Sequence, residues 1–381
     1  MQPPIIIVGT GLAGYQLARE YRRIDPESPL ILLTLDDGTF YSKPLLSTAL
    51  TSGKTSTTLA ITSAENMASQ LKAIIRTHTR VTRIDTENKL IWINDESLAY
   101  HKLVLACGAD VIQPPLQGNA VSDVMAVNHL HHYALFQEKL KNKKHITILG
   151  AGLIGCEFAN DLGNAGYEVH VIAPVKAPLE LLVPESIGMM LKTALSALNI
   201  HWHLPSLCQT VDKSDEGYLL TLSTGETIKT ELILSAIGLL PHIGLAKSGN
   251  MKTQRGIVVN RYLETSATDV YALGDCAEVE GHVLPYITPI LNCTRALAKT
   301  LKGERTAVAY PAMPVVVKTP AHPLVICPPP RGTEGNWEIE NTANSVRALF
   351  YNADNQLAGF ILTNDAVKER STLVKELPSL F

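Results

Sequence analysis

The sequence predicts an α/β protein with two Rossmann-like domains and a small α+β C-terminal domain. Three observations support this prediction. Residues 5–18 (IIIVGTGLAGYQLA) are repeated at residues 146–159 (ITILGAGLIGCEFA), each copy starts with an apolar run, and residues 311–381 carry only short strand-like runs. The chain has 381 residues, whereas one hydrophobic core usually organises about 100 to 150. Several domains are therefore expected.

The first copy begins with a short β-branched run, Ile5–Val8, that suits a buried parallel strand. Gly9, Gly11 and Gly14 follow it as a Gly-x-Gly-x-x-Gly turn, before residues that can begin a helix. In such a turn the first glycine permits a tight bend, the second lets a pyrophosphate approach the backbone, and the third lets the helix pack closely. Free N–H groups at the helix start attract the diphosphate. This copy therefore predicts a dinucleotide site.

An acidic residue follows the second predicted strand of this unit. The apolar run Leu30–Leu35 ends at Asp36, about the distance at which a ribose-binding acid is expected. Asp37 is the alternative ligand, since a carboxylate at either position can accept bonds from two neighbouring hydroxyls. The alternative structural explanation is a solvated Asp36-Asp37-Gly38 turn.

The second copy predicts another dinucleotide site. Its three glycines are Gly150, Gly152 and Gly155. At the place of the ribose-binding acid stand Ala173 and Pro174, which offer neither an acid to favour NAD nor an arginine to favour NADP. Glu157 comes two residues after the third glycine, where it could meet the second cofactor or simply complement the helix dipole.

The order of the remaining runs predicts a discontinuous first domain. Residues 103–106 lead into Gly108, and a Gln-Pro-Pro segment at 113–115 leaves the first domain. Residues 232–237 lead to Gly238 and would return the chain. The predicted domains are residues 1–114 with 254–310, residues 115–253, and residues 311–381.

Composition and charge exclude several classes of function. The formal net charge is −3, which gives no basic footprint for nucleic acid. No apolar stretch reaches the roughly 18 residues of a membrane span. The six cysteines are scattered along the chain, so we expect free thiols and a protein of the reducing cytoplasm. His129, His131 and His132 share neither a helix face nor a strand face, so no metal site is predicted.

These motifs, in this order, resemble the two-dinucleotide-binding flavoprotein reductases related to ferredoxin reductase and glutathione reductase. The segment at 265–277, with Gly274 and Asp275, is similar to the family's second FAD motif. The resemblance implies that Asp275 binds a ribityl hydroxyl, that FAD occupies the first glycine turn, and that NADH occupies the second. At Cys107-Gly108 the chain departs from the family's usual Thr-Gly, which leaves the backbone role of Gly108 intact.

Several segments are most similar to the members that pass electrons from NADH through FAD to rubredoxin, in support of an oxygenase or alkane hydroxylase. They are VGTGLAGYQLARE, TLDDGTFYSKPLLST, LGAGLIGCEFANDL, YALGDCAEVEG and MPVVVKTPAHPL. Residues 41–47 contain no cysteine, unlike the disulfide-reductase branch. The alternatives are a ferredoxin or flavorubredoxin reductase, and a non-catalytic flavoprotein that senses NADH.

The resemblance places Lys43 and Pro44 beside the flavin ring. Because reduced flavin tends toward an anion, a nearby cation should stabilise it. Lys43 is the first candidate, and Lys318, at the end of a three-valine run, is the second; both could instead be surface lysines. In relatives a glutamate at the position of Glu157 meets the nicotinamide near the flavin. Lys43, Lys318 and Glu157 are therefore the candidate catalytic residues.

Overall fold

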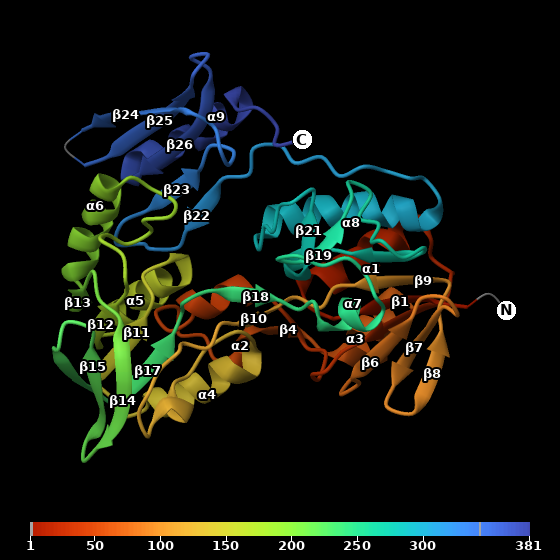
Figure 1. Ribbon diagram of the computed structural model, residues 1–381, viewed down its shortest axis with the longest axis horizontal. Coiled ribbons are helices and arrows are strands. Elements are labelled where there is room, and N and C mark those ends of the chain that lie inside the picture. The colour runs from red at the N-terminus through yellow and green to blue at the C-terminus, as the bar shows by residue number, and fades with distance from the viewer. Residues whose placement is uncertain (1–2, 343) are drawn as a thin grey trace.

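The first domain is built on a parallel sheet in the order β20-β9-β1-β2-β5. The protein is described by a computed structural model that covers residues 3–342 and 344–381 (Figure 1). The five strands are β1 (Ile5–Val8), β2 (Leu30–Leu33), β5 (Ile74–Arg76), β9 (Lys102–Leu105) and β20 (Val270–Ala272). The predicted strand at residues 30–35 ends two residues early, and Leu35 is exposed.

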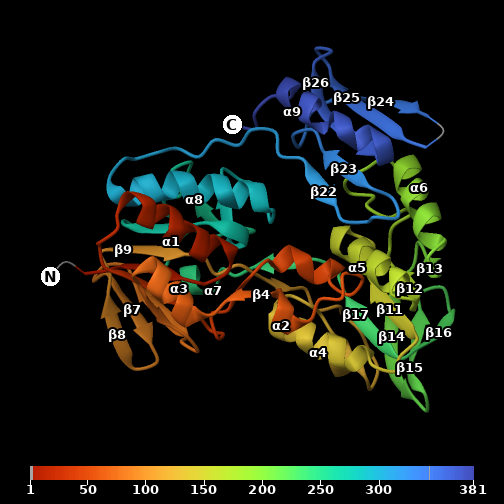
Figure 2. The same ribbon diagram turned by 180° about the vertical axis from the view of Figure 1, so that it is seen from behind.

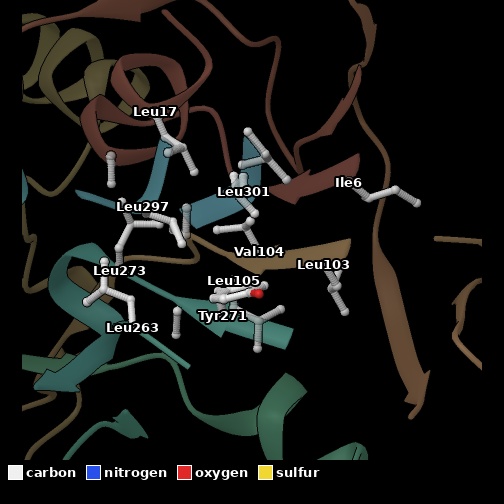
Figure 3. Packing of buried hydrophobic residues seen from close by; sticks show 14 of the residues in the cluster. Ile6, Leu17, Leu103, Val104, Leu105, Leu263, Tyr271, Leu273, Leu297 and Leu301 are labelled. Atoms are coloured by element: carbon white, nitrogen blue, oxygen red, sulfur yellow. The ribbon is translucent and has the colours of Figure 1, made fainter. Parts of the chain in front are cut away.

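Two helices from opposite ends of this domain cover its sheet. Helices α1 (Leu12–Ile24) and α8 (Ile287–Lys302) run side by side (Figures 1 and 2). Figure 3 shows Leu17 of α1 and Leu297 of α8 above Val104 of β9, all three fully buried. The shared core explains why residues after 253 return to the N-terminal sheet.

Smaller elements surround this sheet. They are β3 (Phe40–Tyr41), the 3₁₀ helix η1 (Lys43–Thr48), α2 (Ser56–Leu59), β4 (Ala60–Thr62), α3 (Ala64–Leu71), β6 (Val81–Asp85), β7 (Leu90–Ile93), β8 (Glu96–Ala99), α7 (Gly244–Ser248), β19 (Ile257–Val259), the 3₁₀ helix η3 (Gly274–Cys276) and β21 (Ala277–Val279).

The second domain repeats the parallel arrangement, in the order β13-β12-β11-β17. Its elements are η2 (Val121–Asp123), α4 (Leu130–Leu140), β11 (His145–Leu149), α5 (Leu153–Asn164), β12 (Glu168–Ile172), α6 (Glu185–Ser196), β13 (Ile200–His203), β14 (Cys208–Ser214), β15 (Gly217–Leu222), β16 (Thr227–Thr230) and β17 (Leu232–Ser235). Strand β11 lies between β12 and β17 just as β1 lies between β2 and β9. The two glycine-rich copies therefore occupy equivalent positions in two sheets.

Two short antiparallel strands join these domains. Strand β10 (Ala109–Val111) pairs with β18 (Leu239–Pro241), so the chain leaves and re-enters the first domain at one place (Figure 1). Helix α7 already packs against β6 of the first domain. The boundaries at 114/115 and 253/254 remain predictions.

The C-terminal domain is an antiparallel sheet in the order β22-β23-β26-β25-β24. Its elements are β22 (Val315–Val317), β23 (Leu324–Cys327), β24 (Gly335–Asn341), β25 (Val346–Asn352), β26 (Leu357–Thr363), the 3₁₀ helix η4 (Asn364–Glu369) and α9 (Arg370–Glu376). The sequence does not reveal β24 because nearly all its side chains are exposed, which removes the apolar alternation of a half-buried strand. The predicted class, two Rossmann-like domains with a small α+β domain, is confirmed.

Candidate functional site

The first glycine turn leaves room for a ligand at one glycine only. Gly9 has φ +117°, and a Cβ there would lie 2.1 Å from the Ala106 carbonyl oxygen. A Cβ at Gly14 would lie 1.9 Å from the Gly9 oxygen, whereas nothing lies within 4 Å at Gly11. No side chain caps α1, whose N-cap is Gly11. The turn thus presents uncapped helical N–H groups to an open cradle, which suits a diphosphate.

The second glycine turn has the same geometry. Cβ atoms at Gly150 and Gly155 would approach backbone oxygens of Ala236 and Gly150 to 2.5 and 2.1 Å, and the space at Gly152 is open. Gly152 is also the N-cap of α5 and no side chain caps that helix. The residues present therefore fit two dinucleotides, one at each turn.

Asp36 lies in an ordered turn three residues beyond β2. Its Oδ1 accepts hydrogen bonds from the Thr34 hydroxyl (2.6 Å) and the Gly38 N–H (3.0 Å). Asp37 accepts only from the Thr39 N–H (2.9 Å), within the described part of the chain. The turn predicted as the alternative structural explanation is present, and it also fixes the Asp36 carboxylate at the carboxyl edge of the sheet, where a ribose would lie.

Lys43 and Asp275 are both half-buried, and each changes the pKa of the other through its charge. Gly274 packs so closely that an added Cβ would lie 2.8 Å from the Ala13 Cβ. Burial lowers the pKa of Lys43, and the negative charges of Asp275 and Asp110 oppose that shift. Burial likewise raises the pKa of Asp275, opposed by Lys43. Lys43 and Asp275, which were predicted separately from the sequence, therefore interact electrostatically.

A buried polar cluster joins all three domains, and we call it the junction cluster: Ser47, Glu157 and Lys318. Glu157 is only 3% exposed. Its Oε2 accepts a 2.5 Å hydrogen bond from the Ser47 hydroxyl and forms an ion pair with the Lys318 ammonium, while its Oε1 accepts from the Lys318 N–H at 3.1 Å. The Lys318 ammonium also donates to the Ser47 hydroxyl at 3.1 Å. Every charge in this cluster is therefore matched.

Helix α5 contributes two further polar residues to the same junction. Both Asp161 oxygens accept backbone N–H groups 2.9 Å away, from Leu50 and Thr51. The Asn160 side chain accepts the Ala321 N–H at 3.2 Å. Sequence reasoning missed Ser47, Asn160 and Asp161. The spacing of positions 157, 160 and 161, which lie on one helix face, is the signal that could have found the last two.

The remaining predicted residues occupy turns at the edges of the sheets. Gly108 (φ +71°) links β9 to β10, and Gly238 (φ +128°) links β17 to β18. Pro44 lies in the first turn of η1, directly after Lys43. Because η1 also carries Ser47, this one short helix connects the Lys43 region with the junction cluster.

The three neighbouring histidines have a local structural role in helix α4. His129 is its N-cap, and the ring Nδ1 accepts the His132 N–H at 3.4 Å. Burial, followed by the charge of His132, lowers the pKa of His129 to about 4. Among residues 3–342 and 344–381, no group of three or more His, Cys, Asp or Glu side chains could hold a metal ion.

Comparison with known proteins identifies the families that these domains resemble. Residues 3–302 match the family described as pyridine nucleotide-disulphide oxidoreductase, and residues 307–377 match the rubredoxin binding C-terminal domain. The chain is 49% identical over 378 residues to a rubredoxin-NAD(+) reductase of Alcanivorax borkumensis, covering 99% of both chains. It is 44% identical over 386 residues to a protein of the same name from Acinetobacter baylyi, covering 99% of this chain and 98% of that one.

The fold also matches solved structures. A ferredoxin reductase from Rhodopseudomonas palustris superposes with a TM-score of 0.89 at 23% identity, covering 99% of this chain and 96% of the other. No helix in the described residues is long and apolar enough to cross a membrane.

Proposed function

The chain belongs to the pyridine nucleotide-disulphide oxidoreductase family, and we propose that it is a reductase that passes electrons from NADH through FAD to rubredoxin. The observation that carries this proposal is the match of residues 307–377 to a rubredoxin-binding domain, on a chain with two dinucleotide cradles. FAD, when bound, accepts two electrons from NADH and releases them one at a time. The protein has to hold both cofactors, stabilise charge and admit the carrier.

Each dinucleotide has its own group of binding residues. Gly9, Gly11 and Gly14 hold the FAD diphosphate, with Asp36 on the adenosine ribose and Asp275 on the ribityl chain. Gly150, Gly152 and Gly155 hold the NADH diphosphate. Gly108 and Gly238 shape the turns that border the two sites.

Lys43 is the main cation for stabilising the reduced flavin. Lys318 was the second candidate for this role, but its ammonium is neutralised by Glu157. Lys43 instead is balanced only at longer range, by Asp275 and Asp110, within the residues described. Because Lys43 is half-buried, its positive charge would be less screened by water toward a neighbouring flavin ring.

The junction cluster has a positioning role. Glu157 lies near the start of α5, the helix whose N-cap is Gly152 of the NADH cradle, while Ser47 and Lys318 belong to the other two domains. The ion pair between Glu157 and Lys318, together with the Ser47 hydroxyl that is hydrogen-bonded to both, fixes the relative orientation of the three domains. This arrangement would align a bound nicotinamide with a bound flavin and would hold the C-terminal domain beside both. Glu157 and Lys318, which the sequence predicted as catalytic residues, are therefore proposed as positioning residues.

Thiol chemistry is not part of the proposed reaction. Segment 41–48 beside the flavin contains no cysteine. Cys156, which precedes Glu157, is fully buried, and burial raises the pKa of its thiol far above the usual range. A neutral buried thiol is a poor nucleophile. The free cysteines fit a protein that works in the cytoplasm.

The test is an anaerobic titration of the flavin-loaded protein with NADH, followed by addition of oxidised rubredoxin. We expect the yellow absorbance to bleach and then to recover rapidly on addition of rubredoxin. Ferredoxin and flavorubredoxin serve as alternative acceptors. Equal, slow recovery of the yellow absorbance with all three carriers would reject rubredoxin as the specific acceptor. A long-lived reduced complex that no carrier reoxidises quickly would favour the alternative of a non-catalytic flavoprotein that senses NADH.

A further inference from the structure

The loop between β12 and α6, residues 173–184, is anchored to the second glycine turn. The Leu179 N–H donates a 2.9 Å hydrogen bond to the carbonyl of Ala151, which stands between Gly150 and Gly152. Leu179 is 3% exposed and has φ +60°, a conformation that a leucine rarely adopts without support from its surroundings. This part of the loop is therefore held at a fixed position beside the cradle.

Glu180 follows that anchor and reaches back across the loop. Its Oε1 accepts a hydrogen bond from the Lys176 N–H at 3.4 Å. Residues 177–179 are buried, whereas Glu180 and Lys176 are exposed. The Glu180 carboxylate is thus exposed to solvent on the loop that follows β12, one residue after the contact with the glycine turn.

We propose that Glu180 is the acid that makes this site select NADH over NADPH. When a pyrophosphate lies over a glycine turn, the adenosine ribose lies at the end of the next strand. Ala173 and Pro174 occupy that end and have no acceptor group. Glu180, on the same loop and one residue after its contact with the glycine turn, supplies the missing carboxylate and accepts hydrogen bonds from the ribose hydroxyls. This inference rests on the proposed function.

The negative charge of Glu180 increases the preference for NADH over NADPH. A 2′-phosphate carries nearly two negative charges, so a carboxylate at the same place repels it. Lys176, on the same loop, is exposed and has no ion pair in the portion of the chain described. Without Glu180, Lys176 would attract the 2′-phosphate. The preference therefore depends on the balance between these two side chains.

The experiment measures binding of NAD⁺ and NADP⁺ to the oxidised, flavin-loaded protein by calorimetry, so that no turnover occurs. The wild-type protein should bind NAD⁺ more tightly. Glu180→Gln should lower the ratio of the NADP⁺ dissociation constant to the NAD⁺ dissociation constant about tenfold, which corresponds to about 1.4 kcal/mol. Glu180→Arg should reverse the preference, and adding Lys176→Met to Glu180→Gln should weaken NADP⁺ binding again.

Glu185→Gln is the matched control, because Glu185 is an exposed acid in the first turn of α6 with the same charge. An unchanged ratio in Glu180→Gln, or an equal change in Glu185→Gln, would overturn the assignment to Glu180. If the wild-type protein bound neither nucleotide while retaining FAD, the proposed function itself would fail. The two failures are therefore distinguishable.

Discussion

The Ser47 hydroxyl donates a 2.5 Å hydrogen bond to the Glu157 carboxylate, although the two residues are 110 positions apart in the chain. Ser47 lies on a 3₁₀ helix of the first domain, and Glu157 lies on the helix that follows the second glycine turn. With Lys318 they form one buried cluster from three domains. The Ser47 hydroxyl is thus one of the contacts that set the relative placement of the two cofactor sites.

Replacing Ser47 with alanine should destabilise the domain junction. A hydrogen bond to a charged group contributes about 1.5 to 3 kcal/mol, and alanine leaves one Glu157 oxygen with fewer donors. We expect the apparent free energy of unfolding to fall by about 2 kcal/mol in urea titrations followed by circular dichroism. Thr48→Ala is the control, since its hydroxyl bonds only to the Leu45 carbonyl at 3.4 Å among the residues described. Equal effects would contradict the role of Ser47.

Replacing Glu157 alone with glutamine should lower the free energy of unfolding more than replacing Glu157 and Lys318 together. Glutamine leaves the partly buried Lys318 ammonium unpaired, and breaking such a pair from one side is strongly unfavourable. Because the Lys318 side chain is 29% exposed, we expect a loss of about 2 kcal/mol. The double variant Glu157→Gln, Lys318→Met should recover at least about 1 kcal/mol in a double-mutant cycle. Additive losses would show that the pair does not interact.

The two open cradles predict separable losses of cofactor. Gly11 and Gly152 have negative φ and open space at Cβ, so valine fits the fold but fills the cradle. Gly11→Val should purify as a folded, colourless protein, because it cannot hold FAD. Gly152→Val should stay yellow, but NADH should no longer reduce its flavin. Absorbance spectra and an anaerobic NADH titration test both outcomes.

Gly14→Ala is the contrasting variant, since its Cβ would lie 1.9 Å from the Gly9 carbonyl oxygen. The helix would have to move away from the sheet, and we expect a protein that fails to fold rather than one that loses FAD alone. A folded, colourless Gly14→Ala protein by circular dichroism would contradict the packing role of this glycine.

Removing the charge of Lys43 should make the flavin harder to reduce. Lys43→Met takes away the cation that favours the electron-loaded form. For a two-electron couple, 1.4 kcal/mol corresponds to about 30 mV, and we expect the midpoint potential to fall by at least about that amount. Spectroelectrochemistry measures the shift, and Lys54→Met, at an exposed lysine, is the control. A flavin midpoint potential that is unchanged in Lys43→Met as well as in Lys54→Met would exclude Lys43 as the stabilising cation.

His129 should make the protein less stable in mild acid. An unfolded histidine takes up a proton near pH 6.5, whereas in the folded protein the pKa of His129 is about 4. Between these values the unfolded state binds more protons, so stability falls as the pH drops from 6.5 to 4. We expect a loss on the order of 1 kcal/mol, because the ring is partly exposed.

His129→Asn should flatten that dependence, since asparagine keeps the helix N-cap but does not titrate. Thermal unfolding between pH 4 and 7 measures it, and His131→Asn, at an exposed position, is the control. A wild-type slope retained in His129→Asn would assign the acid sensitivity to another group.

Local patterns in the sequence determined the repeated units and the fold class. The strand at Ile5–Val8, the six turn glycines and the three-valine run at 315–317 all follow from neighbouring residues, because a tight turn between a buried strand and a helix imposes its requirements within a few positions. The polar strand β24 escaped detection because it lacks a buried face.

Only the tertiary structure decided which distant side chains meet. Glu157 and Lys318 were each recognised in the sequence, but neither their pairing nor the hydroxyl of Ser47 between them leaves a local pattern. The same holds for the contact of Leu179 with Ala151, which brings the loop carrying Glu180 to the second glycine turn. The periodicity of apolar residues along a helix or strand predicts which face of that element is buried. Contacts between domains depend on how those faces pack together, and this is fixed by the whole chain.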